Sequence, residues 1–121
     1  HTSSELVYFA GGVVPESLGL DKAAMKPVYD AAAKNKRHFK QVEIHLERQD
    51  SYGTLSDSTE LRFYIILRFN DGQEMTSLYT RTTRKGLARK IAWRMEEDMG
   101  KYFELIKKNR GKKIEGVTNT M

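Results

Sequence analysis

The sequence predicts an α+β fold in which an antiparallel sheet of three to four strands carries two helices on one face. The predicted order is strand, helix, three strands, helix. Two observations lead to this prediction. Apolar residues alternate with polar ones over 42–46 and 61–69, which is typical of half-buried strands. Over 87–106 apolar residues instead recur every three or four positions, as they do on the buried side of a helix.

The chain has the length of one domain. Its 121 residues are 39% hydrophobic and include no Cys, so we expect a single folded domain over 5–108 without disulfides or Cys-ligated metals. Residues 1–4 are typical of a tag remnant or a disordered end. Residues 109–121 have no apolar period and contain two Gly, which predicts a mobile basic tail.

One strand and one helix are predicted before the alternating segments. The apolar run over 6–10 predicts a buried strand, and Gly11-Gly12 predicts a turn at its end. Pro27 lacks the N–H that a helix interior needs, so we expect the main helix over 26–34 with Pro27 in its first turn.

Three antiparallel strands follow. The first begins at Phe39, and a polar loop over 49–60 leads to the second at 61–69. Asn70-Asp71-Gly72 can supply the positive φ angles of a tight hairpin, so the chain is expected to return along 73–81.

The last helix is expected to be capped by Thr82 or Thr83 and to lie across the sheet. Gly100 weakens its middle by about 1 kcal/mol relative to Ala, which leaves a bend or an early stop near Met99 open. Its predicted buried stripe consists of Leu87, Ile91, Met95, Met99, Tyr102 and Ile106.

The formal net charge of +5 comes from the second half of the chain. Residues 61–121 contain 14 Lys and Arg against seven Asp and Glu, whereas residues 1–60 are slightly acidic. A basic field attracts polyanions such as RNA before any specific contact forms. The alternative is a basic surface that serves only solubility.

The last helix also carries the candidate nucleic-acid-binding cations. One predicted ridge consists of Lys90, Arg94, Lys101 and Lys108, which fall on one side of the helix. A second cluster around the helix start consists of Arg84, Lys85 and Arg89, where backbone N–H groups over 82–85 are expected to help hold a phosphate. The alternative is a solvated helix face that Glu97 and Glu104 partly neutralise.

Trp93 is predicted to be exposed, with Gly86 and Gly100 seven residues away on either side. An exposed indole bordered by glycines can stack on a nucleobase or anchor a partner helix. The alternative is that a terminus or a loop buries Trp93.

The sheet face opposite the helices supplies three further candidates for RNA contacts: Arg62, Tyr64 and Arg68. Glu43 and Glu47 are expected on the same face, so cross-strand ion pairs are an alternative explanation for the arginines. An uncovered face would leave Tyr64 in water, which favours a dimer or another partner.

The sequence does not support catalysis. No catalytic residues, cofactor or metal site are predicted, because His38 and His45 would project to opposite sides of one strand and no nucleophile motif is present. No apolar run is long enough to cross a bilayer, which predicts a soluble intracellular protein without a membrane partner.

The order of the segments LVYFAGG, QVEIHLER, ELRFYIILRFNDG and QEMTSLYTR, followed by a basic helix, resembles the layout of ribosome-hibernation factors over residues 5–108. That resemblance implies binding to ribosomal RNA on the small subunit, with Lys90, Arg94 and Lys101 as the closest equivalents. The run Thr83-Arg84-Lys85 with Ala88-Arg89 is also similar to the final helix of double-stranded RNA-binding domains, which contacts phosphates.

These observations predict a non-enzymatic RNA-binding module that acts by occlusion or sequestration of ribosomal or double-stranded RNA through its last helix. The alternative is a protein-interaction module, namely a homodimer, an inhibitor of an acidic protein or an accessory subunit. Such a module would use Trp93 and the exposed sheet face.

Overall fold

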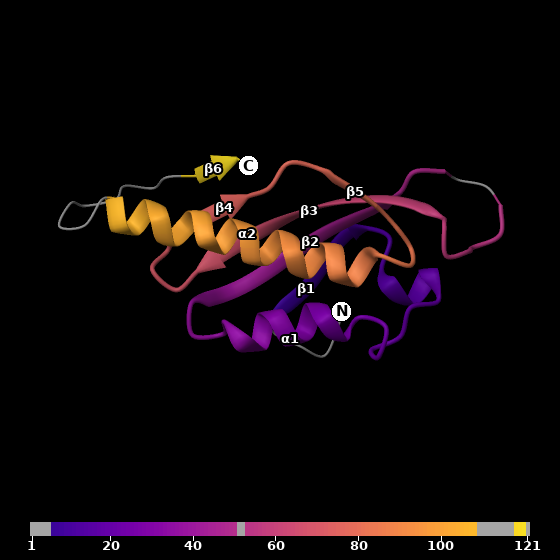
Figure 1. The fold of residues 1–121 in the computed structure, drawn as a ribbon, viewed down its shortest axis with the longest axis horizontal. Helices are drawn as coiled ribbons and strands as arrows, with labels where there is room; N and C mark the ends of the chain where they lie inside the picture. The colour runs from indigo at the N-terminus through magenta and orange to yellow at the C-terminus, as the bar shows by residue number, and fades with distance from the viewer. Residues whose placement is uncertain (1–5, 51–52, 109–117, 121) are drawn as a thin grey trace.

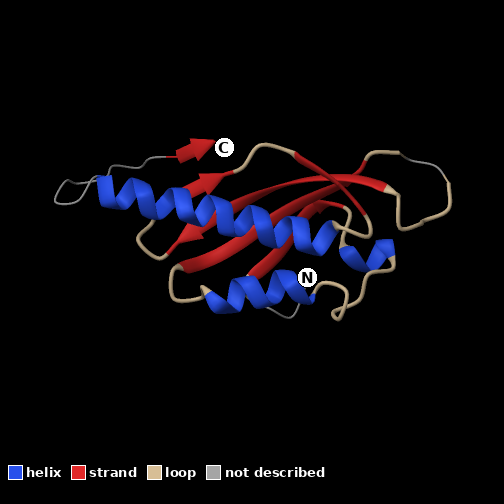
Figure 2. Ribbon diagram, in the orientation of Figure 1, coloured by secondary structure: helices blue, strands red, loops and turns tan. Residues whose placement is uncertain are grey.

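The computed structural model describes residues 6–50, 53–108 and 118–120, and its architecture is α+β as predicted. Two helices cover one face of a single sheet, and the other face is open (Figures 1 and 2). The elements are β1 (Val7–Gly12), a 3-10 helix η1 (Pro15–Leu18), α1 (Lys26–Lys34), β2 (Phe39–Arg48), β3 (Glu60–Phe69), β4 (Glu74–Thr76), β5 (Thr80–Thr83), α2 (Leu87–Lys108) and β6 (Thr118–Thr120).

The sheet is mixed, so the prediction of a purely antiparallel sheet is wrong at its two edges. Its order is β1-β2-β3-β4-β6, and β5 also pairs with β3. β3 pairs antiparallel with β2, β4 and β5. β1 lies parallel to β2, and β6 lies parallel to β4. β1 and β2 are parallel because the chain between them crosses the sheet through α1 rather than turning back in a hairpin.

The alternating pattern places its apolar residues in the core as predicted. Phe63, Ile65 and Leu67 of β3 are fully buried, and so are their counterparts on β2. α1 has the predicted bounds, with Pro27 at its start. Tyr102 of α2 stacks on Phe69, the last residue of β3, with a ring-centroid distance of 3.5 Å.

The buried stripe of α2 ends earlier than predicted. Its members are buried up to Tyr102, whose hydroxyl donates a hydrogen bond to Asp71 in the β3–β4 turn. Ile106 is 37% exposed, because the helix has passed the end of the turn that Tyr102 contacts. α2 continues without interruption through Gly100.

Gly11-Gly12 lies at the end of the first strand as predicted, but as the last two residues of β1 rather than as a turn. Both glycines have positive φ, 71° and 62°, and the register with β2 shifts between Phe9 and Gly12. The glycines therefore form an irregularity of the strand, after which Val13 still donates its N–H to the carbonyl of Leu46 at 2.8 Å.

The returning strand predicted over 73–81 is broken into β4 and β5, and the helix begins later than predicted. Gly72 has a positive φ of 89° in the hairpin, as expected, but Asn70 and Asp71 do not. Thr82 and Thr83 pair with β3 as part of β5, and α2 starts at Leu87. The Thr83 hydroxyl oxygen still accepts the Gly86 N–H at 3.3 Å, directly before the helix.

The two ends of the chain lie mostly outside the described residues. This holds for the predicted tag remnant over 1–4 and for most of the tail over 109–121. Within that tail, residues 118–120 form β6 and pair with β4.

Candidate nucleic-acid interface

Trp93 lies on the solvent side of α2, as predicted. Its side chain is 45% exposed. Lys90 Nζ lies 4.9 Å and Arg94 Cζ lies 4.6 Å from the centre of its ring. Each cation over an exposed indole stabilises it by about 0.5–1 kcal/mol. The ring nevertheless remains accessible to a ligand, because almost half of Trp93 is exposed.

The glycines on either side of Trp93 differ in what surrounds them. A Cβ atom at Gly86 would lie 3.3 Å from Thr82 Oγ1, so Gly86 packs against the end of β5. A Cβ atom at Gly100 would meet nothing within 4 Å. The helix surface beside Trp93 is therefore open on the Gly100 side only.

Arg94 is not a free cation of the predicted ridge. Its guanidinium donates to Asp98 Oδ1, at 3.1 Å from Nε and 3.0 Å from the terminal nitrogen. Asp98 is fully buried, and burial raises the pKa of its carboxyl although Arg94 opposes that shift. The main partner of Arg94 is thus a buried carboxylate, and its charge is largely compensated.

Arg84 is also engaged within the fold. Its Nε donates to the carbonyl of Leu18 at 2.7 Å, and its terminal nitrogens lie 3.4 Å from the carbonyl of Gly19 and 3.5 Å from Asp57. These contacts fasten the end of η1 and the loop before β3 to the start of α2.

At the predicted phosphate site before the helix, the backbone N–H groups already donate hydrogen bonds within the protein. The N–H groups of Arg84 and Lys85 donate to the carbonyls of Thr59 and Asp57, at 2.8 and 3.0 Å. That of Gly86 donates to Thr83. The segment therefore presents side chains but not the backbone donors that a bound phosphate needs.

Arg84→Ala should lower the free energy of unfolding by about 2 kcal/mol, since it removes charge-assisted hydrogen bonds that join three segments. Urea denaturation measures the loss. Arg89→Ala is the matched control, because Arg89 is exposed and its removal should cost less than about 0.5 kcal/mol. Equal losses in both variants would contradict a tethering role for Arg84.

Lys101 and Lys108 lie apart from Trp93, in a different electrostatic setting. They line a groove of about 640 Å³ between the C-terminal half of α2 and Met75 of β4. Its acidic lining residues are Glu96, Glu97 and Glu104. Three glutamates against two lysines make this part of the predicted ridge poorly suited to a polyanion.

Of the cations predicted to bind nucleic acid, three remain outside the acidic groove, just before α2 and in its first turn. From Arg84 to Met95 the sequence contains five cations and no acidic residue. Among the described residues, Lys85, Arg89 and Lys90 make no ion pair. Since residues three and four apart are neighbours on a helix, Arg89 and Lys90 flank Trp93. We call Lys85, Arg89, Lys90 and Trp93 the Trp93 cluster.

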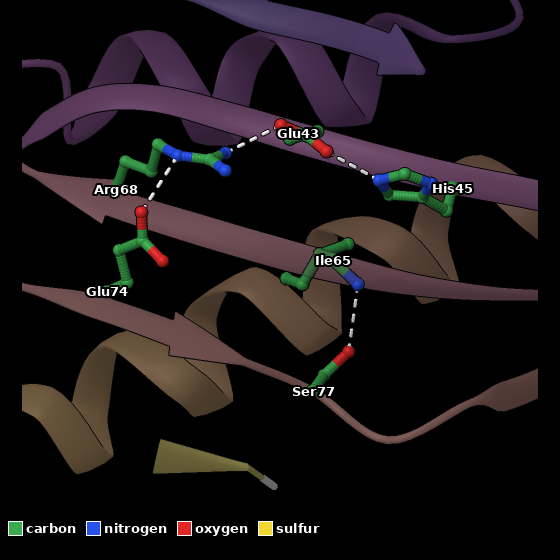
Figure 3. A network of polar contacts seen from close by, with 6 residues as sticks. All are labelled: Glu43, His45, Ile65, Arg68, Glu74 and Ser77. Carbon is green, nitrogen blue, oxygen red and sulfur yellow. Dashed lines mark hydrogen bonds and ion pairs between the residues drawn. The ribbon is translucent and has the colours of Figure 1, made fainter. Parts of the chain in front are cut away.

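The arginines of the open sheet face are paired with glutamates, as the alternative explanation expected. Arg68 lies 2.6 Å from Glu43 and 3.0 Å from Glu74, in the network that Figure 3 shows in front of the strands. Arg62 lies 2.8 Å from Glu47. Burial opposes the shift, but hydrogen bonds with His45 and Arg68 hold the pKa of the Glu43 carboxyl below its usual range. Hydrogen bonds from Arg62 and Tyr79 lower the pKa of the Glu47 carboxyl, again against its partial desolvation.

Tyr64 is likewise engaged. It stacks on His45, with ring centroids 4.4 Å apart, and meets Tyr79 edge to face at 5.1 Å. His45 Nε2 lies 2.5 Å from Glu43. Arg62, Tyr64 and Arg68 therefore belong to one network of the sheet rather than to the Trp93 cluster.

The break between β4 and β5 was not predicted from the sequence. There the hydroxyl oxygen of Ser77 accepts the N–H of Ile65 at 2.9 Å, and the Ser77 N–H donates to the Ile65 carbonyl (Figure 3). Leu78 and Tyr79 are then displaced onto the open face, where they are 62% and 46% exposed. No local sequence signal marks this break.

No protein-family model matches the chain, and no curated protein matches it. The resemblances to ribosome-hibernation factors and double-stranded RNA-binding domains therefore stay predictions. Within the described segments, no helix is both long enough and apolar enough to span a membrane. The same segments contain no group of three or more His, Cys, Asp or Glu residues placed to share a metal ion.

Proposed function

We propose that this protein is a non-enzymatic RNA-binding module that contacts unpaired segments of RNA through the Trp93 cluster. The observation that carries the proposal is the exposed indole with Lys90 over its ring, where Lys85, Arg89 and Lys90 make no ion pair among the described residues. Every nucleobase has a face on which an indole can stack, and lysine or arginine can neutralise the adjoining phosphates. Binding of this kind is largely independent of base sequence, so it would act by occluding or sequestering the RNA.

The proposed set of contact residues is smaller than the set predicted from the sequence. Lys85, Arg89 and Lys90 remain as the proposed cations, because Arg84 and Arg94 are engaged with the protein itself. RNA and DNA both offer the bases and phosphates that the cluster would bind. The resemblances given above favour RNA. A DNA oligonucleotide of the same sequence distinguishes the two sources.

Titration of the protein with a single-stranded RNA oligonucleotide should quench the fluorescence of Trp93, which is the only Trp in the chain. Trp93→Ala should weaken binding of the same labelled RNA by about tenfold, since stacking contributes about 1–3 kcal/mol per base. Anisotropy of the labelled RNA measures the affinity. Absence of binding at low salt would overturn the proposal, and tighter binding of the DNA oligonucleotide would reassign the ligand.

The salt dependence tests the role of the cations separately. Replacing Lys85, Arg89 and Lys90 together with Gln should reduce the slope of log affinity against log salt by about 2, because each phosphate contact to a single strand contributes about 0.7. The matched control replaces Lys36, Arg37 and Lys40, three exposed cations before β2 and at its start, and changes the net charge equally. If both triple variants reduce the slope alike, net charge rather than the cluster drives binding.

A further inference from the structure

The open face of the sheet has an apolar hollow beside β3 and β4, next to the ion-paired network. Tyr64, Ile66, Leu78 and Tyr79 line a hollow of about 370 Å³ on this face, together with Thr76 and Ser77. The side chains around it are held by the ion pairs described above. An apolar patch bordered by polar groups is the usual composition of a protein interface, and Leu78 and Tyr79 are both exposed here.

We propose that two copies of this chain associate face to face through the open faces of their sheets. This inference goes beyond the proposed function, because the Trp93 cluster lies on α2 and α2 covers the other face of the sheet (Figure 1). Two arguments select a second copy as the occupant: the distribution of charge over the strands, and the area of the face.

Charges on the open face are separated by strand. β2 contributes the acids Glu43 and Glu47, whereas β3 contributes the bases Arg62 and Arg68. Glu47 and Arg62 are direct cross-strand partners, and Arg68 lies opposite Gln41. Glu74 of β4 and Arg81 of β5 share this face, as the register partners of Arg68 and Arg62. The described face therefore has an acidic β2 beside a basic β3 and no large net charge.

This distribution is self-complementary under one two-fold rotation. If the axis runs parallel to the strands between β2 and β3, each acidic strand meets the basic strand of the other copy, and Glu47 of each chain faces Arg62 of the other. A perpendicular in-plane axis would instead place Arg62 against Arg68, which repel each other. The parallel axis also leaves the strands of the two sheets aligned, which is the common packing of two sheets.

The face is also large enough. β1 to β5 contain 6, 10, 10, 3 and 4 residues, and each residue covers about 3.3 Å along its strand and about 4.8 Å between strands. The face is therefore on the order of 500 Å² in projection, which approaches the roughly 600 Å² of accessible surface per partner at the lower end of specific interfaces. Twisted sheets expose more accessible surface than their projection.

Sedimentation velocity of the protein without nucleic acid should show twice the chain mass of 14.0 kDa at micromolar concentration. Leu78→Asp should weaken dimerisation by about thirtyfold, and circular dichroism should show an intact fold because Leu78 is 62% exposed. Trp93→Ala is the control and should leave the dimer unchanged. A chain that stays at the monomer mass over the whole concentration range overturns the proposal and assigns the face to a different partner.

A charge exchange between copies tests the orientation. Glu47→Arg and Arg62→Glu should each sediment as monomers, since each places like charges across the axis. A mixture of the two variants should recover the dimer, because the two arginines of the first variant then face the two glutamates of the second. Recovery cannot come from pairing within one chain, where both variants keep like charges side by side. Two folded variants that remain monomeric when mixed, while the unaltered chain dimerises, would overturn this face-to-face arrangement.

Discussion

Gly12→Ala should lower the free energy of unfolding by about 3 kcal/mol or more, although the change adds a single methyl group. Gly12 has a φ of 62°, and a Cβ atom there would lie 2.0 Å from the carbonyl oxygen of Leu46. That oxygen belongs to the main chain of β2 and accepts the Val13 N–H, so it cannot move aside without breaking the pairing of β1 with β2.

Gly11→Ala is the matched control for this prediction. Gly11 has a similar φ of 71°, but the nearest atom to its Cβ would be His45 Nδ1 at an ordinary 3.7 Å. The expected cost is about 1–2 kcal/mol, from the left-handed backbone conformation alone. Thermal and urea unfolding of the two variants separate the cost of the overlap with Leu46 from the cost of the left-handed conformation. If both variants lose the same stability, overlap with Leu46 is not the cause.

The parts of the fold that the sequence predicts are those with a strong period. The alternation along β2 and β3 and the three-to-four spacing along α2 fix which side of each element is buried, because a shift by one residue would expose a full row of apolar side chains. The parallel direction of β1 depends instead on how α1 crosses the sheet. At the break, the Ile65 N–H donates to the Ser77 hydroxyl instead of to a backbone carbonyl. No pattern in the sequence predicts this hydrogen bond.

The candidate site shows the same division. Exposure of Trp93 follows from its angle on α2, so it could be predicted from sequence. The partners of Arg84 are up to 66 residues away, which no local pattern can indicate. The partner of Arg94 was visible in the sequence, because Asp98 follows it by four residues. It was missed because a carboxylate on the buried side of a helix is uncommon.

Arg94→Met should lower the free energy of unfolding by about 3 kcal/mol at neutral pH, through the carboxylate that it leaves behind. Asp98 is fully buried, and among the described residues its Oδ2 atom has no hydrogen-bond partner. Its other oxygen has Arg94 as partner, so loss of the guanidinium leaves a buried charge without compensation. Arg89→Met, an exposed cation on the same helix, should change stability by less than about 0.5 kcal/mol.

The pH dependence of that loss identifies Asp98 as its source. Burial raises the pKa of Asp98 in the folded protein, and removal of Arg94 should raise this pKa further. A raised folded-state pKa adds stability below the unfolded-state pKa, and this stability is lost as pH rises through the folded-state value. The difference between Arg94→Met and the unaltered protein should therefore shrink as pH falls from 7 toward the ordinary value of 3.8. Adding Asp98→Asn to Arg94→Met should recover part of the loss at pH 7 and remove its pH dependence. A deficit that is constant with pH would mean that the lost packing of Arg94, rather than the charge of Asp98, sets the cost.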